Sequence, residues 1–165
     1  MNAFKIGCDV GVNGAFALLK NGEIIDIWDM PASTATYGKK NKKEVSPQLL
    51  NIMVGEMKSI CDGYGGSYTL EANVERVNAF GMGATSAFGF GRSAGVVAGV
   101  LAAHNVPIDY VMPMQWKKQF GLIKAGKDAT RTLALEKFPA NADLFKRKKD
   151  VDRADAVFIG LYTPF

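Results

Sequence analysis

The fold is decided by a stretch near the start of the chain, FKIGCDVGVNGAFALLKNGEIIDIWD (residues 4–29). It contains three short apolar or alternating runs, and the pair Asn21-Gly22, a strong signal for a two-residue β-hairpin, separates the second run from the third. The pattern predicts a meander of three strands over residues 4–9, 15–20 and 23–29.

Helix and strand patterns alternate downstream of this meander. Ser46 and Pro47 are typical of an N-cap and a first helical turn. The remaining predictions are a basic loop at 31–44, helices at 46–61, 93–105, 113–120, 128–138 and 150–162, strands at 68–77 and 107–112, and a glycine-rich loop at 81–91. This order predicts an α/β fold, a mixed five-stranded sheet with helices on both faces, as in ribonuclease H-like folds.

Length and composition favour one packed domain over residues 1–165, because 48% of the residues are hydrophobic and only 22% are charged. Cys8 and Cys61 are too few to staple a domain of this size, so we expect free thiols in a reducing compartment. We see no signal peptide and no apolar window of about 18 residues, which predicts a soluble intracellular protein without a membrane partner. The net charge of +4 mildly favours polyanionic partners.

Acidic residues stand where three predicted elements could bring them together. Asp9 ends an apolar strand, Glu71 and Glu75 lie in a strand that otherwise looks buried, and Asp152 and Asp155 are three apart on a helix. Each has a structural reading too: a turn cap, solvated glutamates of an edge strand, or acids favoured by the helix dipole. The DxGxxG pattern after Asp9 also occurs in sugar kinases and actin-like ATPases, but those need two such domains.

Together, Asp9, one strand glutamate and the two helix aspartates form a set of hard oxygen ligands that suits Mg²⁺ or Mn²⁺. Paired ions of this type hydrolyse phosphodiesters. Basic runs accompany the acids and could neutralise phosphates, although any one run is usually a solvated face. These runs are Lys39, Lys40, Lys42 and Lys43; Lys117 and Lys118; Lys124 and Lys127; and Lys146, Arg147, Lys148 and Lys149.

The chain resembles RuvC-type Holliday junction resolvases, especially the phage-encoded and chloroplast branches, over nearly its whole length. The resemblance rests on IGCDVGVNGAFALL, NVERVNAF, SAFGFGRSAGVVAGVL, VMPMQWKKQFGL, GKDATRTLALEKFP and LFKRKKDVDRADAVFIGLY, in that order. It implies a homodimeric, Mg²⁺-dependent endonuclease that nicks opposed strands of a four-way DNA junction. We expect Mn²⁺ to substitute, with two ions in each active site.

The resemblance also implies roles for single residues. Asp9, Glu75, Asp152 and Asp155 would bind the metals, and Lys117 or Lys118 and Lys127 would lie near the cleaved backbone, with Lys127 among the catalytic residues. Further DNA contacts are expected from Arg92, Lys146, Arg147, Lys148 and Phe80. Some members have a wedging aromatic three residues after the strand glutamate, where this chain has Asn78, with Phe80 two residues later.

Strand register favours Glu75 over Glu71, because ligands of open sheets bind beyond the carboxyl ends of parallel strands and Glu75 is near that end.

Three functions follow as hypotheses. The first is resolution of branched DNA, expected in a phage-infected bacterial cytoplasm or an organelle. The second is a nuclease of the same fold that acts on RNA–DNA hybrids or DNA ends, and the third is a junction-binding protein that does not cleave.

Overall fold

The computed structural model describes residues 1–164, and of Tyr37 the backbone only. Its centre is a five-stranded sheet in the order β3-β2-β1-β6-β7. β2 pairs antiparallel with β1 and β3, whereas β6 pairs parallel with β1 and β7. The strands are β1 (Asn2–Asp9), β2 (Ala15–Lys20), β3 (Glu23–Asp29), β6 (Tyr68–Glu75) and β7 (Ile108–Val111). The expected mixed five-stranded sheet of a ribonuclease H-like fold is therefore confirmed.

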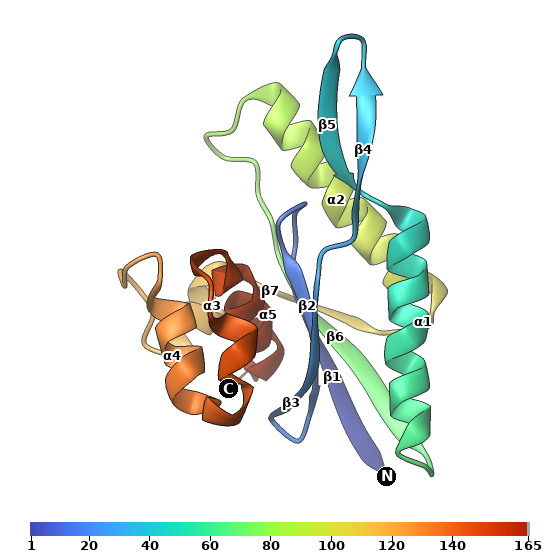
Figure 1. Ribbon diagram of the computed structural model, residues 1–165, viewed down its shortest axis with the longest axis vertical. Helices are drawn as coiled ribbons and strands as arrows, with labels where there is room; N and C mark the ends of the chain where they lie inside the picture. Colours follow the sequence, from blue (N-terminus) through green and yellow to red (C-terminus); the bar gives the residue numbers. More distant parts are fainter. Residues whose placement is uncertain (165) are drawn as a thin grey trace.

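Helices cover both faces of the sheet (Figure 1). One face carries α1 (Pro47–Gly63) and α2 (Ala84–Ala103). The other carries α3 (Pro113–Gln119), α4 (Ala129–Lys137), the 3-10 helices η1 (Pro139–Phe145) and η2 (Lys148–Asp150), and α5 (Val151–Leu161). As predicted, α1 begins after Ser46, whose side chain accepts a hydrogen bond from the Leu49 N–H.

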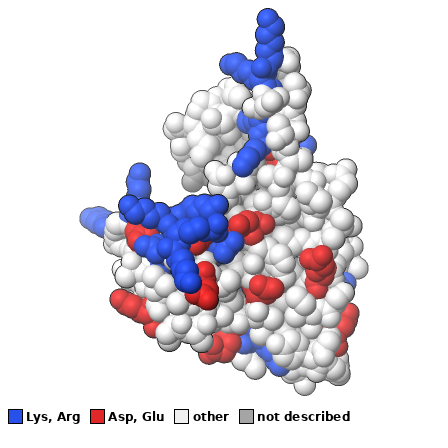
Figure 2. All heavy atoms as spheres, in the orientation of Figure 1, with Lys and Arg blue, Asp and Glu red and all other residues white. Residues whose placement is uncertain are grey.

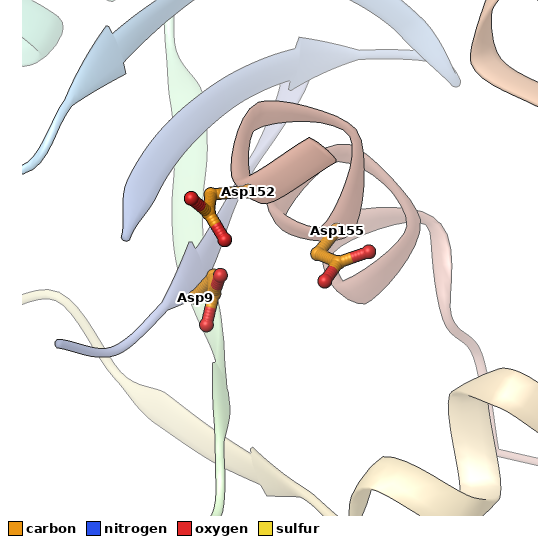
Figure 3. Close-up of side chains that lie close together, drawn as sticks. All are labelled: Asp9, Asp152 and Asp155. Atoms are coloured by element: carbon orange, nitrogen blue, oxygen red, sulfur yellow. The ribbon is translucent and has the colours of Figure 1, made fainter. Parts of the chain in front are cut away.

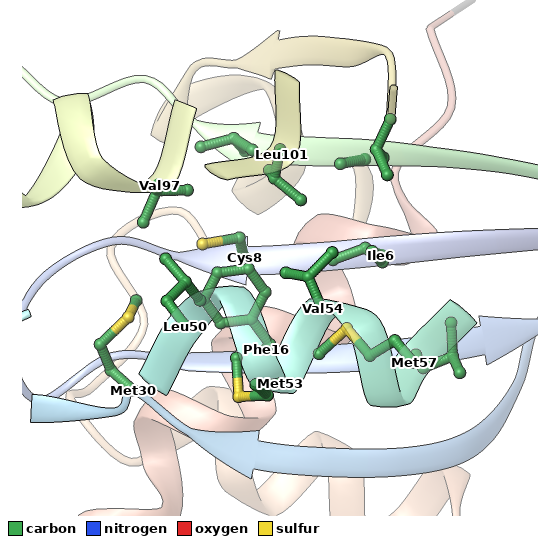
Figure 4. Close-up of a cluster of buried hydrophobic side chains, with 14 of the residues drawn as sticks. Ile6, Cys8, Phe16, Met30, Leu50, Met53, Val54, Met57, Val97 and Leu101 are labelled. Atoms are coloured by element: carbon green, nitrogen blue, oxygen red, sulfur yellow. The ribbon is translucent and has the colours of Figure 1, made fainter. Parts of the chain in front are cut away.

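Alternation along the strands divides the buried side chains into two cores. Phe4, Ile6 and Cys8 of β1 pack with α1 and α2, in the cluster drawn in Figure 4. Gly7 and Asp9 have the opposite parity and face α5. Cys8 and Cys61 are both buried free thiols, as expected, and they lie in the first core.

The contact between β1 and α5 depends on two glycines. A Cβ on Gly7 would collide with the Ala156 carbonyl oxygen and lie 2.5 Å from the Gly160 nitrogen. Asn73 of β6 completes the end of α5, because its Nδ2 donates to the carbonyl oxygens of Ile159 and Tyr162, each at 2.9 Å. These contacts hold the second half of α5 against β1 and β6.

Two sequence predictions need correction. Residues 31–44 are not a loop but form most of a hairpin of β4 (Ala32–Tyr37) and β5 (Lys40–Val45). β5 is rich in lysine, which is depleted in strands, but it pairs with β4, whose threonines favour strands. Residues 84–91 belong to α2, so the glycine-rich loop is shorter than expected. Helical hydrogen bonding overrides glycine's low propensity here. Figure 1 shows the hairpin projecting from the sheet beside α2.

We expected no window apolar enough to span a membrane. By length and composition alone, that expectation was wrong. Among the described residues one helix, α2, is long and apolar enough to cross a bilayer, since its 20 residues include a single charged one, Arg92. In the structure Val97 and Leu101 of α2 instead pack on the sheet. Solubility and an intracellular location stay predictions.

Candidate metal and nuclease site

Asp9 is the last residue of the central strand β1, and it lies at the carboxyl end of that strand, where α5 begins. The turn after it is tight: the Gly14 N–H donates to the Gly11 carbonyl at 3.1 Å, and a Cβ on Gly14 would collide with the Asp9 carbonyl oxygen. The glycines following Asp9 therefore permit the chain to reverse closely behind it. This leaves the Asp9 carboxylate facing the first turns of α5.

Asp152 and Asp155 are the acids in the first two turns of α5. Together with Asp9 they offer one carboxylate oxygen each, and these three oxygens lie within 4.8 Å of one another. In Figure 3 the Asp9 and Asp152 carboxylates approach each other, and Asp155 lies one turn further along the helix. The structure thus brings together acids that are more than 140 residues apart in sequence.

Glu75 ends β6, the parallel neighbour of β1, and lies beside these aspartates. Its Oε1 accepts a hydrogen bond of 2.9 Å from Nε1 of Trp116, whose side chain is buried. Glu71 lies in the middle of the pairing, four residues before Glu75 and opposite Lys5, with which it forms a partly exposed ion pair of 2.9 Å. The parallel register proposed from the sequence is therefore present, and it separates Glu71 from Asp9.

Burial and mutual repulsion disfavour the charged forms of these acids. Burial raises the pKa of Asp9 well above its usual value, and the charge of Glu75 raises it further. Burial also raises the pKa of Asp155 to about 6, although hydrogen bonding by Thr130 opposes the shift. The pKa of Glu75 is likewise raised by burial, against the Trp116 hydrogen bond. Acids packed in this way require a cation to be ionised together.

The donor set fits a hard divalent cation. All its ligand atoms are carboxylate oxygens, which Mg²⁺ and Mn²⁺ prefer. Asp155 Oδ1 is buried and has no hydrogen-bond partner among the described residues, so one buried acceptor is left over for an ion. An acidic cluster compatible with divalent metal binding is therefore present.

Of the predicted basic residues, Lys117 is the one whose charge acts on several of the acids. Its charge lowers the pKa of Asp9, Glu75 and Asp155, and its Nζ lies 5.2 Å from the Trp116 ring centre. Lys118 is exposed on α3, and Lys127 is exposed in the loop before α4. The structure thus places one of the three predicted lysines within electrostatic reach of the cluster.

The other predicted DNA contacts are distributed over the surface. Three of them are ion-paired: Arg147 with Asp150 at 2.8 Å, Lys146 with Asp143 at 2.6 Å, and Arg92 with Glu44 at 2.9 Å. Lys148 is exposed in η2, and Phe80, before α2, is 92% exposed. Figure 2 shows basic side chains gathered on the side of the molecule formed by α3, α4 and α5 and again along the hairpin, with acidic side chains beside the first group.

Two residues in contact with the acids were missed by the sequence analysis. Trp116 was interpreted as a packing residue, and only its position next to Lys117 pointed to the site. Thr130, which hydrogen-bonds Asp155, had no signal at all. Both lie on helices whose placement against the sheet depends on tertiary packing.

Comparisons with known proteins identify the fold. The structure is similar to "Thermus thermophilus RuvC structure", with a TM-score of 0.52 and 16% identity, covering 96% of this chain and 91% of that chain. It is also similar to "T. thermophilus RuvC in complex with Holliday junction substrate", with a TM-score of 0.54 and 15% identity, covering 96% and 90%. No protein-family model and no curated protein sequence matches the chain.

Proposed function

From the RuvC-like fold of this chain, we propose that the protein is a divalent-metal-dependent endonuclease that cuts four-way and other branched DNA. The observation that carries the proposal is a cluster of three aspartates from β1 and α5. The cluster lies beside Glu75, at the carboxyl ends of β1 and β6. A solved structure of similar fold is a RuvC bound to a Holliday junction, which supports branched DNA as the ligand class.

The acids would hold two Mg²⁺ ions, with Mn²⁺ as a substitute. Asp9, Glu75 and Asp155 would hold the ions, and Asp152 would bind an ion or orient the attacking water. When bound, paired ions of this kind activate water and stabilise the leaving oxygen of a phosphodiester. The leftover Oδ1 acceptor of Asp155 and the raised pKa values of the acids support this assignment.

Basic residues would bind the DNA backbone and offset charge that develops on the phosphate. Lys117 is best placed for the second role, because its charge already acts on Asp9, Glu75 and Asp155. Lys127 would approach the phosphate from the exposed loop before α4. Lys118, Arg92, Lys146, Arg147, Lys148 and Phe80 are proposed as further DNA contacts. Because backbone contacts carry no sequence information, selection of junctions would come from a homodimer's geometry and loop fit.

A nicking assay tests this function. The protein is incubated with Mg²⁺ and, in parallel, with four labelled substrates. They are a four-way junction, a duplex closed at both ends, an RNA–DNA hybrid and a duplex with free ends. We expect paired nicks in opposed strands of the junction, and loss of nicking with a chelator or in Asp9→Asn. That variant should still bind the junction, because removing one negative charge weakens metal binding but also lessens repulsion of phosphate.

Three results would contradict the proposal. Cleavage of the hybrid or the free ends in preference to the junction would assign the protein to the alternative nuclease class. Tight junction binding without metal-dependent nicking would make it a non-cleaving junction-binding protein. If Asp9→Asn nicks at the parent rate, Asp9 is a turn residue and the metal site is wrong.

A further inference from the structure

A groove leads from the acidic cluster along the β4–β5 hairpin. It consists of three hollows of about 420, 280 and 660 Å³. Asp152 lines the first hollow, which shares Val12 and Lys43 with the second; the second shares Lys42 and Gly89 with the third. We call these three adjoining hollows together the hairpin groove. Hollows of these sizes placed end to end suit a chain-like ligand better than one compact small molecule.

Lysines line all three hollows of the hairpin groove. Acidic residues line them as well: Asp29 and Asp150 beside Asp152 in the first, and Glu44, which pairs with Arg92, in the other two. Lys149 and Lys43 line the hollow next to Asp152, and Lys42 and Lys40 line the outer part. Lys42 is held at the groove wall, with its Nζ 3.5 Å from the Thr85 carbonyl oxygen. Among the described residues, none of these four lysines forms an ion pair within 4.0 Å. Their positive charges are therefore available to a polyanion.

Aromatic side chains from α2 lie between these lysines. Phe90 lines the middle hollow, half-buried, and its ring contacts the position where Gly11 would carry a Cβ. Phe88 lines the outer hollow and is 75% exposed, although a large apolar side chain loses free energy when it is left in water. The Phe88 ring is thus open to stacking by a planar ligand.

Positive charges that follow a groove, combined with exposed aromatic rings, are the features that bind single-stranded nucleic acid, because lysines contact phosphates and bases stack on the rings. The phosphates of a duplex could also bind the lysines, but the bases of a duplex are stacked on one another and cannot stack on Phe88. A duplex therefore does not explain the exposed Phe88 ring. We propose that the hairpin groove binds an unpaired DNA strand leading away from the acidic cluster. Binding of a single strand in the groove does not depend on the proposed function. Only the connection of that strand to the DNA being cut rests on it.

The proposal is tested by binding in a chelator, where no metal-dependent cleavage occurs. A fluorescent 12-nucleotide oligothymidylate is titrated with the protein, and anisotropy is followed between 50 and 200 mM salt. Lys42→Ala/Lys43→Ala should weaken binding about tenfold at 50 mM salt and reduce the log–log salt slope by roughly 1.4, about 0.7 for each phosphate contact to a single strand. The charge-matched control is Lys20→Ala/Lys137→Ala, two lysines outside the basic runs that line none of the three hollows.

Stacking is tested at Phe88. Phe88→Leu keeps an apolar side chain but removes the ring, and it should weaken oligothymidylate binding about fivefold or more; Phe88→Tyr should restore binding. Thermal unfolding of each variant checks that it is folded, which we expect because Phe88 lies outside both cores. An unlabelled duplex of the same length should compete less well than the unlabelled single strand.

Three results would overturn the proposal: equal loss of binding in the control pair, unchanged binding in Phe88→Leu, or competition by the duplex as strong as that by the single strand. The outcome is separable from that of the proposed function. If the groove variants behave as expected but the protein nicks no junction in Mg²⁺, the nuclease proposal fails and the groove stands. If junction nicking occurs but single-strand binding does not respond to the groove variants, the groove alone is wrong.

Discussion

Asp155 illustrates at the scale of one residue how a metal site opposes folding. Its carboxyl has a pKa of about 6, raised first by burial, against 3.8 for an ordinary aspartate. As pH rises from 4 to 6 the unfolded chain loses this proton while the folded protein keeps it, so stability falls; above 6 the loss is complete, on the order of 3 kcal/mol.

We therefore expect metal-free Asp155→Asn to be more stable than the parent at pH 7.5, with the difference shrinking as pH falls from 6 to 4. Urea unfolding across this pH range measures it. Mn²⁺ should stabilise the parent but not the variant. A variant that is less stable than the metal-free parent at pH 7.5 would show that the site does not strain the fold.

Trp116 is predicted to position Glu75 through its indole N–H. Trp116→Phe keeps a ring in the core but removes the donor, and the pKa of Glu75 should then rise further, because this hydrogen bond lowers it. The pH midpoint for Mn²⁺ binding, followed by calorimetry without DNA, should shift upward. A purely structural role for Trp116 would lower the melting temperature and leave that midpoint in place.

The two strand glutamates provide a matched pair of variants. Glu75→Gln should eliminate metal-dependent nicking, because Glu75 adjoins the aspartates. Glu71→Gln should retain most nicking, because Glu71 is exposed, lies four residues before Glu75 in β6 and forms an ion pair with Lys5; the cost in stability should be at most about 1 kcal/mol. A dead Glu71→Gln and an active Glu75→Gln, both folded, would reverse the assignment of the site.

At the scale of elements, the position of α5 against β1 determines whether the acids meet. Asp9 belongs to the strand and Asp152 and Asp155 to the helix, so any increase in the β1–α5 distance separates the ligands. Two features hold the distance short. They are the facing glycines Gly7 and Gly160, and the Asn73 side chain that binds the end of the helix.

Gly7→Ala should therefore destabilise the protein by at least about 2 kcal/mol and weaken Mn²⁺ binding, because the new methyl group meets the α5 backbone on a side with no space. The control is Gly99→Ala on α2, where a Cβ would meet no atom within 4 Å; it should gain about 0.5–1 kcal/mol from helix propensity. Chemical denaturation and calorimetry measure the two effects. Equal stability of Gly7→Ala and the parent would mean that α5 can move away without cost.

For the whole molecule, the proposed cutting of two opposed strands requires two active sites, whereas the described residues of one chain hold a single candidate cluster of metal ligands. We expect a homodimer, with a mass in sedimentation equilibrium about twice the 17.8 kDa of one chain. Nicks in the two strands of one junction should then be coupled in time. A monomer at micromolar concentration that still nicks both strands within one binding event would contradict this expectation.

The sequence by itself determined the elements that have strong local signals. Period-two runs around Asn21-Gly22 predicted the meander, and Ser46-Pro47 predicted the start of α1; both are present. It also indicated which acids to consider, because Asp9, Glu75, Asp152 and Asp155 occupy positions near the ends of elements. Signals of this kind act over a few residues, so they are visible before the chain folds.

Only the tertiary structure decided what those residues meet. The order β3-β2-β1-β6-β7 and the parallel register bring Asp9 to the start of α5, and burial then raises the pKa values of these acids. Trp116 reaches Glu75 across 41 residues of sequence, and the lysine-rich residues 40–45 become a strand because they pair with β4. Contacts of this kind depend on packing between distant segments, and strand propensity itself depends on that context, so no local pattern could predict them.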